Sequence, residues 1–399
     1  MNTPINTGMG AEAFQELRRK MNDFIQNELI PLEQEQGLNH ETCFSRELLQ
    51  SIWQRSHELG IYGCNLAVEF GGQGLSISQL CILKEDATRS NAALYGCVLG
   101  ENGGPMRIGY ILNQASEGQL EEFFLPTARG ERAGCFALTE PQAGSDATRI
   151  QTRAVRDGDD YILNGHKRFI TASRTADYAI VMAVTDPEAG TDGVTAFLVD
   201  ADSDGYQISG DYLPMSGQHI DNDILLENVR VPARNILGGL GNGFKLGMNR
   251  ININRLLQCP TMLGHAQFVF DRSVDYANRR EQFGGPISRF QAIQHQLADM
   301  QTALFACRSM ITAAAAKADS GEDIRNEASM CKVFVGENAF QIADKAVQIH
   351  GAVGLTKNDP VEWAFRRLRM FRVLTGSSEI QRNTIAKGIN KAWRQAQDA

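Results

Sequence analysis

One glycine-rich run in this chain has the composition of a phosphate-binding loop. Gly239, Gly241 and Gly243 alternate with other residues between two segments of different periodicity. A dinucleotide-binding loop requires the spacing Gly-x-Gly-x-x-Gly between a strand and a helix of a parallel βαβ unit. The run has neither this spacing nor that setting. It therefore predicts an interdomain turn that leads into a long helix.

The other residue types that commonly carry catalysis lack the spacing that their chemistry needs. The seven histidines include no His-Glu-x-x-His motif, so no metal site is predicted, although His219 and His350 are candidates for lining a pocket. No Gly-x-Ser-x-Gly elbow presents a nucleophilic serine. The eight cysteines form no Cys-x-x-Cys pair and most have apolar neighbours, which indicates reduced, buried thiols in a cytosolic protein.

A third group of motifs is distributed along the chain. Phe136-Ala-Leu-Thr-Glu-Pro-Gln-Ala-Gly-Ser-Asp146 alone would be a strand followed by a Pro/Gly turn. The motifs that follow it are Asn164-Gly-x-Lys167, Phe169-Ile-Thr171, Arg280-Glu-Gln-Phe-Gly284, Gln348-Ile-His-Gly351 and Gly376-Ser-Ser-Glu-Ile-Gln-Arg382. In order and spacing, the set resembles the acyl-CoA dehydrogenase family from about residue 12 to residue 395.

The resemblance implies an FAD-binding homotetramer that acts on an acyl-CoA. The positions that match contacts to the flavin ring are Phe136, Leu138, Thr139, Phe169 and Thr171. Gly144 and Ser145 match the turn near the pyrophosphate and the CoA arm, which makes Ser145 a candidate for substrate binding as well. Those that match contacts to the FAD of a neighbouring subunit are Arg280, Phe283, Gln291, Gln348 and Gly351. Ser377 and Glu379 match positions near adenosine, and Arg255 matches one beside the substrate.

The chain departs from the family at the catalytic base. In the family reaction a glutamate removes the α-proton of a CoA thioester, while the β-hydrogen leaves as hydride to flavin N5. The resemblance places this glutamate either before the glycine that opens the last helix, here Thr375, or directly before Arg255, here Asn254. Neither a threonine hydroxyl nor an amide accepts a proton unaided near neutral pH.

Glu101 is the candidate substitute base. It lies in Leu99-Gly-Glu-Asn-Gly-Gly-Pro105, which roughly matches the helix that floors the acyl pocket. The alternative is a carboxylate that shapes the pocket or caps a helix. The polar series Asn249, Arg250, Asn252, Asn254 and Arg255 would suit a polar acyl group or would only be the solvated start of a helix.

Three interpretations of the function follow. The favoured one is α,β-dehydrogenation of an unusual CoA thioester by a relocated base, with electrons passing to an electron-transfer flavoprotein. The second keeps the flavin and CoA sites but changes the chemistry to enoyl-CoA reduction, elimination or monooxygenation. The third is a non-catalytic partner subunit of a heteromeric dehydrogenase.

The elements that must position these residues form a mostly α-helical chain with one β domain. A helical pattern covers 1–135, including segments at 12–36 and 45–59, and period-two alternation marks a barrel-like β domain at 136–242. Strands are predicted at 178–184, 194–199 and 223–231, and Asn164-Gly165 is predicted to form a tight hairpin turn. A four-helix bundle is predicted for 243–399, with a seam along one helix formed by Phe290, Ile293, Leu297, Met300, Leu304, Cys307, Ile311 and Ala314.

Length, net charge and apolar content limit the kinds of partner that this chain is expected to bind. The length of 399 residues predicts two or three domains. Lys and Arg number 39 against 47 Asp and Glu, giving a net charge of −8 without a basic block, so neither nucleic acid nor an anionic membrane surface is expected as a partner. No apolar run approaches the ~18 residues of a membrane span, and the start of the chain has no targeting pattern. A cytoplasmic protein is expected.

Overall fold

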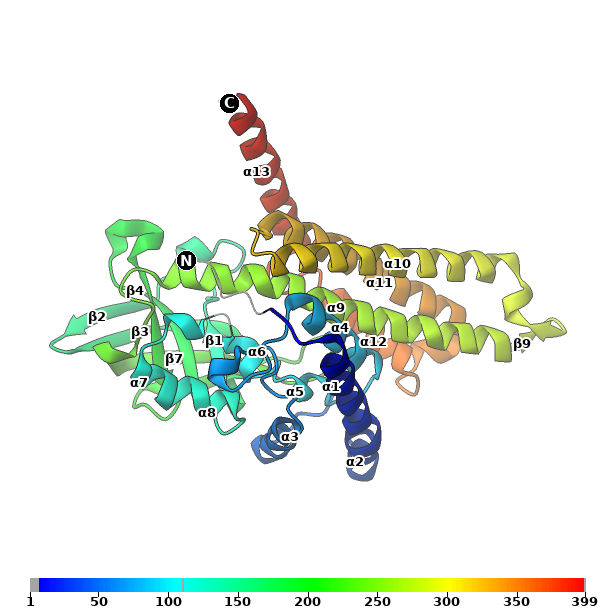
Figure 1. The fold of residues 1–399 in the computed structure, drawn as a ribbon, viewed down its shortest axis with the longest axis horizontal. Helices are drawn as coiled ribbons and strands as arrows, with labels where there is room; N and C mark the ends of the chain where they lie inside the picture. The colour runs from blue at the N-terminus through cyan, green and yellow to red at the C-terminus, as the bar shows by residue number, and fades with distance from the viewer. Residues whose placement is uncertain (1–6, 110, 398–399) are drawn as a thin grey trace. The chain divides into compact units, whose positions relative to one another are not determined.

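The computed structural model describes residues 7–109 and 111–397 and divides them into two compact units (Figure 1). Unit 1 contains residues 7–24, 37–75 and 96–251, apart from residue 110. Unit 2 contains residues 25–36, 76–95 and 252–397.

Unit 1 contains a sheet of eight strands in the order β6-β7-β3-β2-β4-β5-β8, with β1 paired in parallel to β4. The strands are β1 Gly134–Ala137, β2 Arg153–Asp157, β3 Asp160–Thr171, β4 Tyr178–Val184, β5 Val194–Asp200, β6 Tyr206–Asp211, β7 Asp221–Pro232 and β8 Ile236–Leu237. The strands predicted at 178–184, 194–199 and 223–231 correspond to β4, β5 and β7. The predicted β domain is therefore confirmed as a fold class.

Strand β4 is buried on both faces of this sheet. Successive side chains of a strand point to opposite faces. Ile180 and Met182 accordingly pack into one core with Phe123, which precedes the sheet in the chain. Val181 faces a second core that contains Phe197 of β5. A strand enclosed in this way has a continuous apolar sequence, which explains why it was predictable.

The helical part of unit 1 precedes the sheet in sequence. Its helices are α1 Ala11–Phe24, α3 Arg46–Glu58, α5 Tyr95–Val98, α6 Pro105–Ile108, α7 Glu117–Gln119 and α8 Leu125–Ala128, with a π-helical turn at Leu120–Phe124. Helix α5 starts one residue before the point where the chain re-enters unit 1. Helix α3 starts where Ser45 caps it, because the Ser45 hydroxyl accepts the N–H of Leu48 at 3.2 Å. This start agrees with the helix predicted at 45–59.

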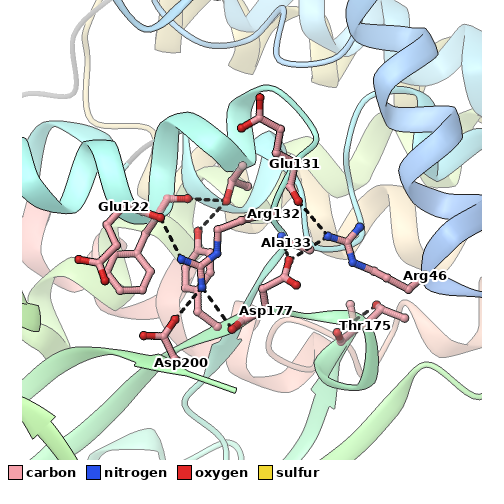
Figure 2. A network of polar contacts seen from close by, with 12 residues as sticks. Arg46, Glu122, Glu131, Arg132, Ala133, Thr175, Asp177 and Asp200 are labelled. Carbon is pink, nitrogen blue, oxygen red and sulfur yellow. Dashed lines mark hydrogen bonds and ion pairs between the residues drawn. The ribbon is translucent and has the colours of Figure 1, made fainter. Parts of the chain in front are cut away.

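Asp177 fixes the entry of β1 into the sheet (Figure 2). Its carboxylate accepts the N–H of Ala133 at 2.6 Å and a guanidinium N–H of Arg46 at 2.9 Å. The N–H of Asp177 donates in turn to the Ala133 carbonyl at 2.8 Å. Arg132, the preceding residue, donates to the Asp200 carboxylate at 2.6 Å (Figure 2). These contacts tie the turn after α8 to both β4 and β5.

The predicted hairpin turn at Asn164-Gly165 is wrong. Strand β3 runs through both residues without interruption, and neither has a positive φ. Gly165 is required for space instead, because a Cβ there would lie 2.3 Å from the hydroxyl oxygen of Thr152, which immediately precedes β2. The turn between β2 and β3 falls at Gly158, where φ is +64°.

The Glu140 carboxylate organises the chain that follows β1. It accepts hydrogen bonds at 2.6–3.0 Å from the N–H groups of Gln151 and Thr152, the Thr152 hydroxyl and the ammonium of Lys167. Lys167 is fully buried and also donates to the Leu138 carbonyl at 3.2 Å. Burial alone would raise the pKa of Glu140, but Lys167 and these hydrogen bonds bring that pKa below its ordinary value. The pair is therefore an ionised, hydrogen-bonded anchor.

Unit 2 consists of packed helices and one small hairpin. Its elements are a π-helical turn Ile25–Leu29, α2 Ile30–Gln36, α4 Ile77–Arg89, α10 Gln291–Asp319, α11 Arg325–His350, α12 Pro360–Met370, α13 Ser378–Gln397, β9 Glu281–Gln282 and β10 Gly285–Pro286. Helix α9 Gly243–Arg279 starts in unit 1 and belongs to unit 2 from Asn252 onward. Helix α10 packs against α4 and α11, and α11 also packs against α12 and α13 (Figure 1).

The predicted seam of α10 is buried from Met300 to Ala314, whereas Ile293 and Leu297 are half-buried. The predicted helical bundle is confirmed as a fold class. Helix α12 was not predicted. It joins the bundle through an ion pair between Asp359, at its start, and Arg272 of α9, with a closest distance of 2.6 Å.

Replacing Glu140 by glutamine should lower the free energy of unfolding by about 3–5 kcal/mol, because Lys167 would be left as an uncompensated buried charge. Urea unfolding followed by circular dichroism measures this change. The control Asp157→Asn removes a carboxylate that is 58% exposed and pairs with Arg230. It should cost less than about 1 kcal/mol. Equal losses in the two variants would contradict the anchoring role of Glu140.

Candidate functional site

Phe169 stands on a bulge in β3. The pairing of β3 with β7 shifts register between Lys167 and Ile170, and Phe169 has a φ of +55°. This conformation is uncommon for a residue other than glycine. A bulge re-aims a side chain, and the Phe169 ring is 53% exposed and packs against Tyr212 with ring centroids 4.5 Å apart. The strand thus presents an aromatic surface outward.

The buried carboxylate of Asp223 holds this bulge in place. One oxygen accepts the N–H of Phe169 at 3.3 Å, and the other accepts the Tyr212 hydroxyl at 2.9 Å and lies 2.7 Å from Nε2 of His166. Arg168 donates to the Tyr212 hydroxyl oxygen at 3.0 Å. Asp223 therefore fixes both the backbone of Phe169 and the ring beside it.

The segment after β1 lies next to this bulge. Phe136, Leu138 and Thr139 are all half-buried. The Thr139 carbonyl accepts the N–H of Arg168 at 2.8 Å, which joins the two groups predicted to contact the flavin ring. The guanidinium of Arg250 lies 4.3 Å from the centroid of the Phe136 ring, a cation–π contact. The structure therefore brings these predicted residues together within unit 1.

The remaining predicted residues of unit 1 lie on turns and at a strand end. Gly144 and Ser145 are exposed, and a Cβ on Gly144 would meet no atom within 4 Å. Thr171 ends β3, and its hydroxyl donates to Asp221 at 2.7 Å. Glu101 is half-buried in the turn after α5, where its N–H donates to the Gly96 carbonyl at 2.8 Å.

Thr375, one of the two positions predicted to lack the family base, is tightly held within unit 2. Its φ is +55°, and its hydroxyl oxygen accepts a hydrogen bond from the Gln258 amide of α9 at 2.6 Å. The next carbonyl, of Gly376, accepts Nζ of Lys332 at 2.9 Å and the amide of Gln381 at 3.0 Å. The turn before α13 is therefore fixed by side chains of three helices.

Arg255 lies against the same turn. It is 8% exposed and donates through Nη1 to Asn252 at 2.8 Å, and its Nη2 lies 3.6 Å from where a Cβ on Gly376 would be. Burial lowers the pKa of Arg255, and the positive charge of Arg325 adds to this effect. Asn254, the second position predicted to lack the base, precedes Arg255 on α9 and is half-buried.

The β9–β10 hairpin carries the predicted Phe283 at its tip. Phe283 and Gly284 have φ values of +53° and +84°, as a tight two-residue hairpin turn requires. The Phe283 ring is 87% exposed and contacts Phe290 edge-on at 6.0 Å. Arg280 precedes this hairpin and Gln291 opens α10, and both are exposed.

The other predicted residues of unit 2 lie at helix ends. Gln348 is exposed in the last turn of α11, and Gly351 follows with a φ of +59°. Ser377 and Glu379 stand at the start of α13, where a hydrogen bond from Ser377 holds the pKa of Glu379 below its ordinary value. An acidic residue in the first turn also suits the helix dipole.

Sequence reasoning missed the side chains that hold these residues in place. Glu140 and Lys167 lie inside the quoted motifs, so a functional signal was present without their roles being recognised. Asp223 and Gln258 gave no signal, because their partners lie 54 and 117 residues away. Cys43 is exposed, contrary to the prediction of buried thiols, whereas the other seven cysteines are buried as predicted.

Two kinds of feature are absent from residues 7–109 and 111–397. No group of three or more His, Cys, Asp or Glu side chains in these ranges is arranged to hold a metal ion. No helix there is long and apolar enough to cross a membrane.

Comparison with known proteins decides the family. The family models of the acyl-CoA dehydrogenase N-terminal, middle and C-terminal domains match residues 11–131, 135–229 and 241–390. The chain belongs to the acyl-CoA dehydrogenase family. It is accordingly a flavoprotein oxidoreductase that uses FAD.

Three relatives of this family illustrate its range. The 3-(aryl)acrylate reductase of Clostridium sporogenes is 37% identical over 377 residues, which cover 94% of this chain and 98% of that protein. The caffeyl-CoA reductase–Etf complex subunit CarC of Acetobacterium woodii is 35% identical, covering 93% and 96%. The solved structure of butyryl-CoA dehydrogenase from Megasphaera elsdenii has a TM-score of 0.87 at 29% identity, covering 96% and 99%.

The residues of unit 1 fit the flavin of this family. A planar ring system needs apolar surface together with polar groups of fixed orientation. The exposed Phe169 and the half-buried Phe136 and Leu138 supply the apolar surface, and the chain around Gly144 is open. Lys167 and Arg168 hold the carbonyls of Leu138 and Thr139 in place.

Asp223→Asn should weaken FAD binding about tenfold or more, because the bulge that carries Phe169 would lose charge-assisted hydrogen bonds. Titration of the apoprotein with FAD, followed by the quenching of flavin fluorescence, measures the dissociation constant. Asp204→Asn, at an exposed position, is the matched control. An unchanged dissociation constant in Asp223→Asn would remove Asp223 from the cofactor site.

Stability should depend on pH through Lys332. Burial lowers the pKa of Lys332 to about 8, against 10.5 as its ordinary value. Between these values the unfolded chain binds one more proton than the folded chain. The free energy of unfolding should therefore rise with pH in this window, by about 1.4 kcal/mol per pH unit from this group.

Urea unfolding of the wild type and of Lys332→Met, from about pH 7 to about pH 10, tests this expectation. The quantity compared is the difference between their free energies of unfolding at each pH. The wild type should gain stability relative to this variant above about pH 8 and show no relative change below it. The exposed variant Lys387→Met should follow the wild type throughout. A difference that does not vary with pH would contradict the effect of burial on Lys332.

Proposed function

We propose that this chain catalyses the α,β-dehydrogenation of a CoA thioester. The observation that carries the proposal is the hydrogen bond between Arg168 and Thr139, which joins the segments predicted to lie on the two sides of the flavin. Bound FAD would supply the hydride acceptor for the β-hydrogen of the acyl group. In this proposal Phe136, Leu138 and Phe169 orient the ring, while Ser145 binds the CoA arm.

The base for this reaction comes from outside the two family positions. Thr375 accepts a hydrogen bond from Gln258, and Asn254 carries an amide, so neither provides a carboxylate. Glu101 is the proposed base, because it is a half-buried carboxylate in the stretch that resembles the floor of the acyl pocket. A carboxylate placed within hydrogen-bonding reach of the α-carbon accepts the α-proton as a general base.

Enoyl-CoA reduction is the second candidate. It is favoured by the names of two relatives, an acrylate reductase and a caffeyl-CoA reductase, at 37% and 35% identity. In this direction the α-carbon receives a proton rather than losing one. The enolate formed at the α-carbon is strongly basic, and water can protonate it without a carboxylate at residue 375.

The proposal includes a protein partner and an assembly. An electron-transfer flavoprotein is the proposed redox partner, supported by the Etf complex named for the CarC relative. A homotetramer is the proposed assembly, in which Arg280, Phe283, Gln291, Gln348 and Gly351 reach the FAD of a neighbouring subunit. The exposed Phe283 ring at the tip of a fixed hairpin supports this arrangement. A cytoplasmic location is part of the same proposal.

Anaerobic titration of the yellow holoprotein with a series of saturated acyl-CoA thioesters tests the reaction. Loss of the flavin absorbance should occur with the wild type and should be about 100-fold or more slower in Glu101→Gln, because the general base is lost. Glu12→Gln, at an exposed position on α1, should react like the wild type.

Each result separates the candidate functions. Unchanged bleaching in Glu101→Gln would exclude Glu101 as the base. Reoxidation of chemically reduced protein by enoyl-CoA, without bleaching by any saturated thioester, would replace dehydrogenation with reduction. Colourless protein that gains activity only with a related chain would indicate a non-catalytic subunit.

A further inference from the structure

Unit 2 encloses a guanidinium whose hydrogen-bonding capacity is not used. Nη1 of Arg255 donates to Asn252, but Nε has no hydrogen-bond partner among the described residues, although it is buried. Within that part of the chain Arg255 also forms no ion pair with a carboxylate. A buried charge is normally paired, and a buried donor without a partner costs free energy. Arg255 thus keeps a buried donor and a positive charge that an anionic group would satisfy.

The surroundings of Arg255 contain a second buried cation. Lys332 of α11 donates to the carbonyls of Phe371 and Gly376 at 3.0 and 2.9 Å. Burial lowers its pKa to about 8, and the nearby charge of Arg255 adds to the lowering. Both cations adjoin Gly376, yet the turn itself contributes only neutral carbonyls to them. The local potential is therefore positive and favours an anion.

Gln258 adds an unused acceptor to the same helix face. Its Nε2 donates to Thr375, but its buried Oε1 has no partner among the described residues. Residues three apart on a helix lie on the same face, so Gln258 and Arg255 are neighbours on α9. Because Oε1 is an acceptor, it is satisfied by a donor such as water or a hydroxyl and does not itself bind an anion.

The departure at Thr375 explains why this charge is uncompensated. In the family that the chain resembles, a glutamate at this position would stand directly before Gly376, against which the Arg255 guanidinium lies. Here a neutral threonine occupies the position and is held by Gln258 at 2.6 Å. The substitution removes a negative charge from the turn and leaves the positive charge of Arg255 in place.

We propose that Arg255 binds a carboxylate carried by the acyl group of the substrate, so that the substrate is an anionic CoA thioester. This inference rests on the proposed function, since it assumes that a CoA thioester is the ligand. A planar guanidinium suits a carboxylate because its N–H groups match the spacing of the two oxygens. The charge that the family keeps in the protein is here supplied by the ligand.

Calorimetric titration of the holoenzyme tests this assignment with pairs of CoA thioesters that differ only in a terminal carboxylate. The pairs are succinyl-CoA with butyryl-CoA, glutaryl-CoA with pentanoyl-CoA, and adipyl-CoA with hexanoyl-CoA. The flavin is first reduced chemically, so that saturated thioesters bind without reacting. The wild type should bind the anionic member of at least one pair about tenfold or more tightly.

Two variants in the site and one control outside it complete the experiment. Arg255→Gln should abolish the preference, and Thr375→Glu should abolish it as well, because the new carboxylate would occupy Arg255. The second variant restores a family residue, so it keeps the test available if Arg255→Gln does not fold. Arg394→Gln, at an exposed position on α13, should retain the preference.

The proposal is overturned if no pair shows a preference or if the preference survives in Thr375→Glu. The experiment distinguishes failure of the carboxylate site from failure of the proposed dehydrogenase activity. Flavin bleaching by pentanoyl-CoA without any preference would retain the activity and remove the carboxylate site. A strong preference for an anionic thioester that never bleaches the oxidised flavin would retain the site and remove the activity.

Discussion

The need to compensate buried charge decides how this chain positions its functional residues. Lys167 is fully enclosed in unit 1 and is stable there because the Glu140 carboxylate lies 2.7 Å away. The same carboxylate collects donors from the start of β2, and Lys167 also reaches the Leu138 carbonyl. One ion pair thereby fixes the segment after β1 relative to two other strands. Asp223 acts in the same way on the bulge that carries Phe169.

The two buried cations beside the turn before α13, Lys332 and Arg255, have different partners from those of Lys167. Lys332 is held by carbonyl oxygens rather than by a carboxylate, and burial lowers its pKa to about 8, as it does for the carboxylate-paired Lys167. Arg255 is left with an unused donor. The turn before α13 therefore has an unused donor beside it, whereas the segments of unit 1 that are predicted to contact the flavin are held by Lys167 and Asp223. A buried donor without a partner in the protein is tolerated where a bound ligand supplies the hydrogen-bond acceptor.

Local sequence was sufficient for elements that depend on local properties. Strand β4 was predictable because both of its faces are buried, which leaves a continuous apolar run. The Asn164-Gly165 turn was mispredicted, because Gly165 is needed for the close approach of Thr152, just before β2, and not for a positive φ. Helix α12 was missed, since its position depends on the ion pair between Asp359 and Arg272 of α9.

The candidate site was predictable only as far as its motifs extend. The positions predicted to contact the flavin follow from short segments whose order along the chain carries the resemblance. The supporting residues do not, because the contact of Gln258 with Thr375 spans 117 positions. The unused donor of Arg255 likewise depends on packing, because it arises where no acceptor lies within hydrogen-bonding distance of that side chain. The sequence alone does not predict such a distance.

The backbone of Thr375 has a consequence for how this protein is expected to have evolved. A φ of +55° is strained for a β-branched residue, at a cost on the order of 1–3 kcal/mol. Asparagine or glycine would adopt it with less strain. Under selection for heat resistance, replacement of Thr375 by either residue is therefore an expected route to higher stability.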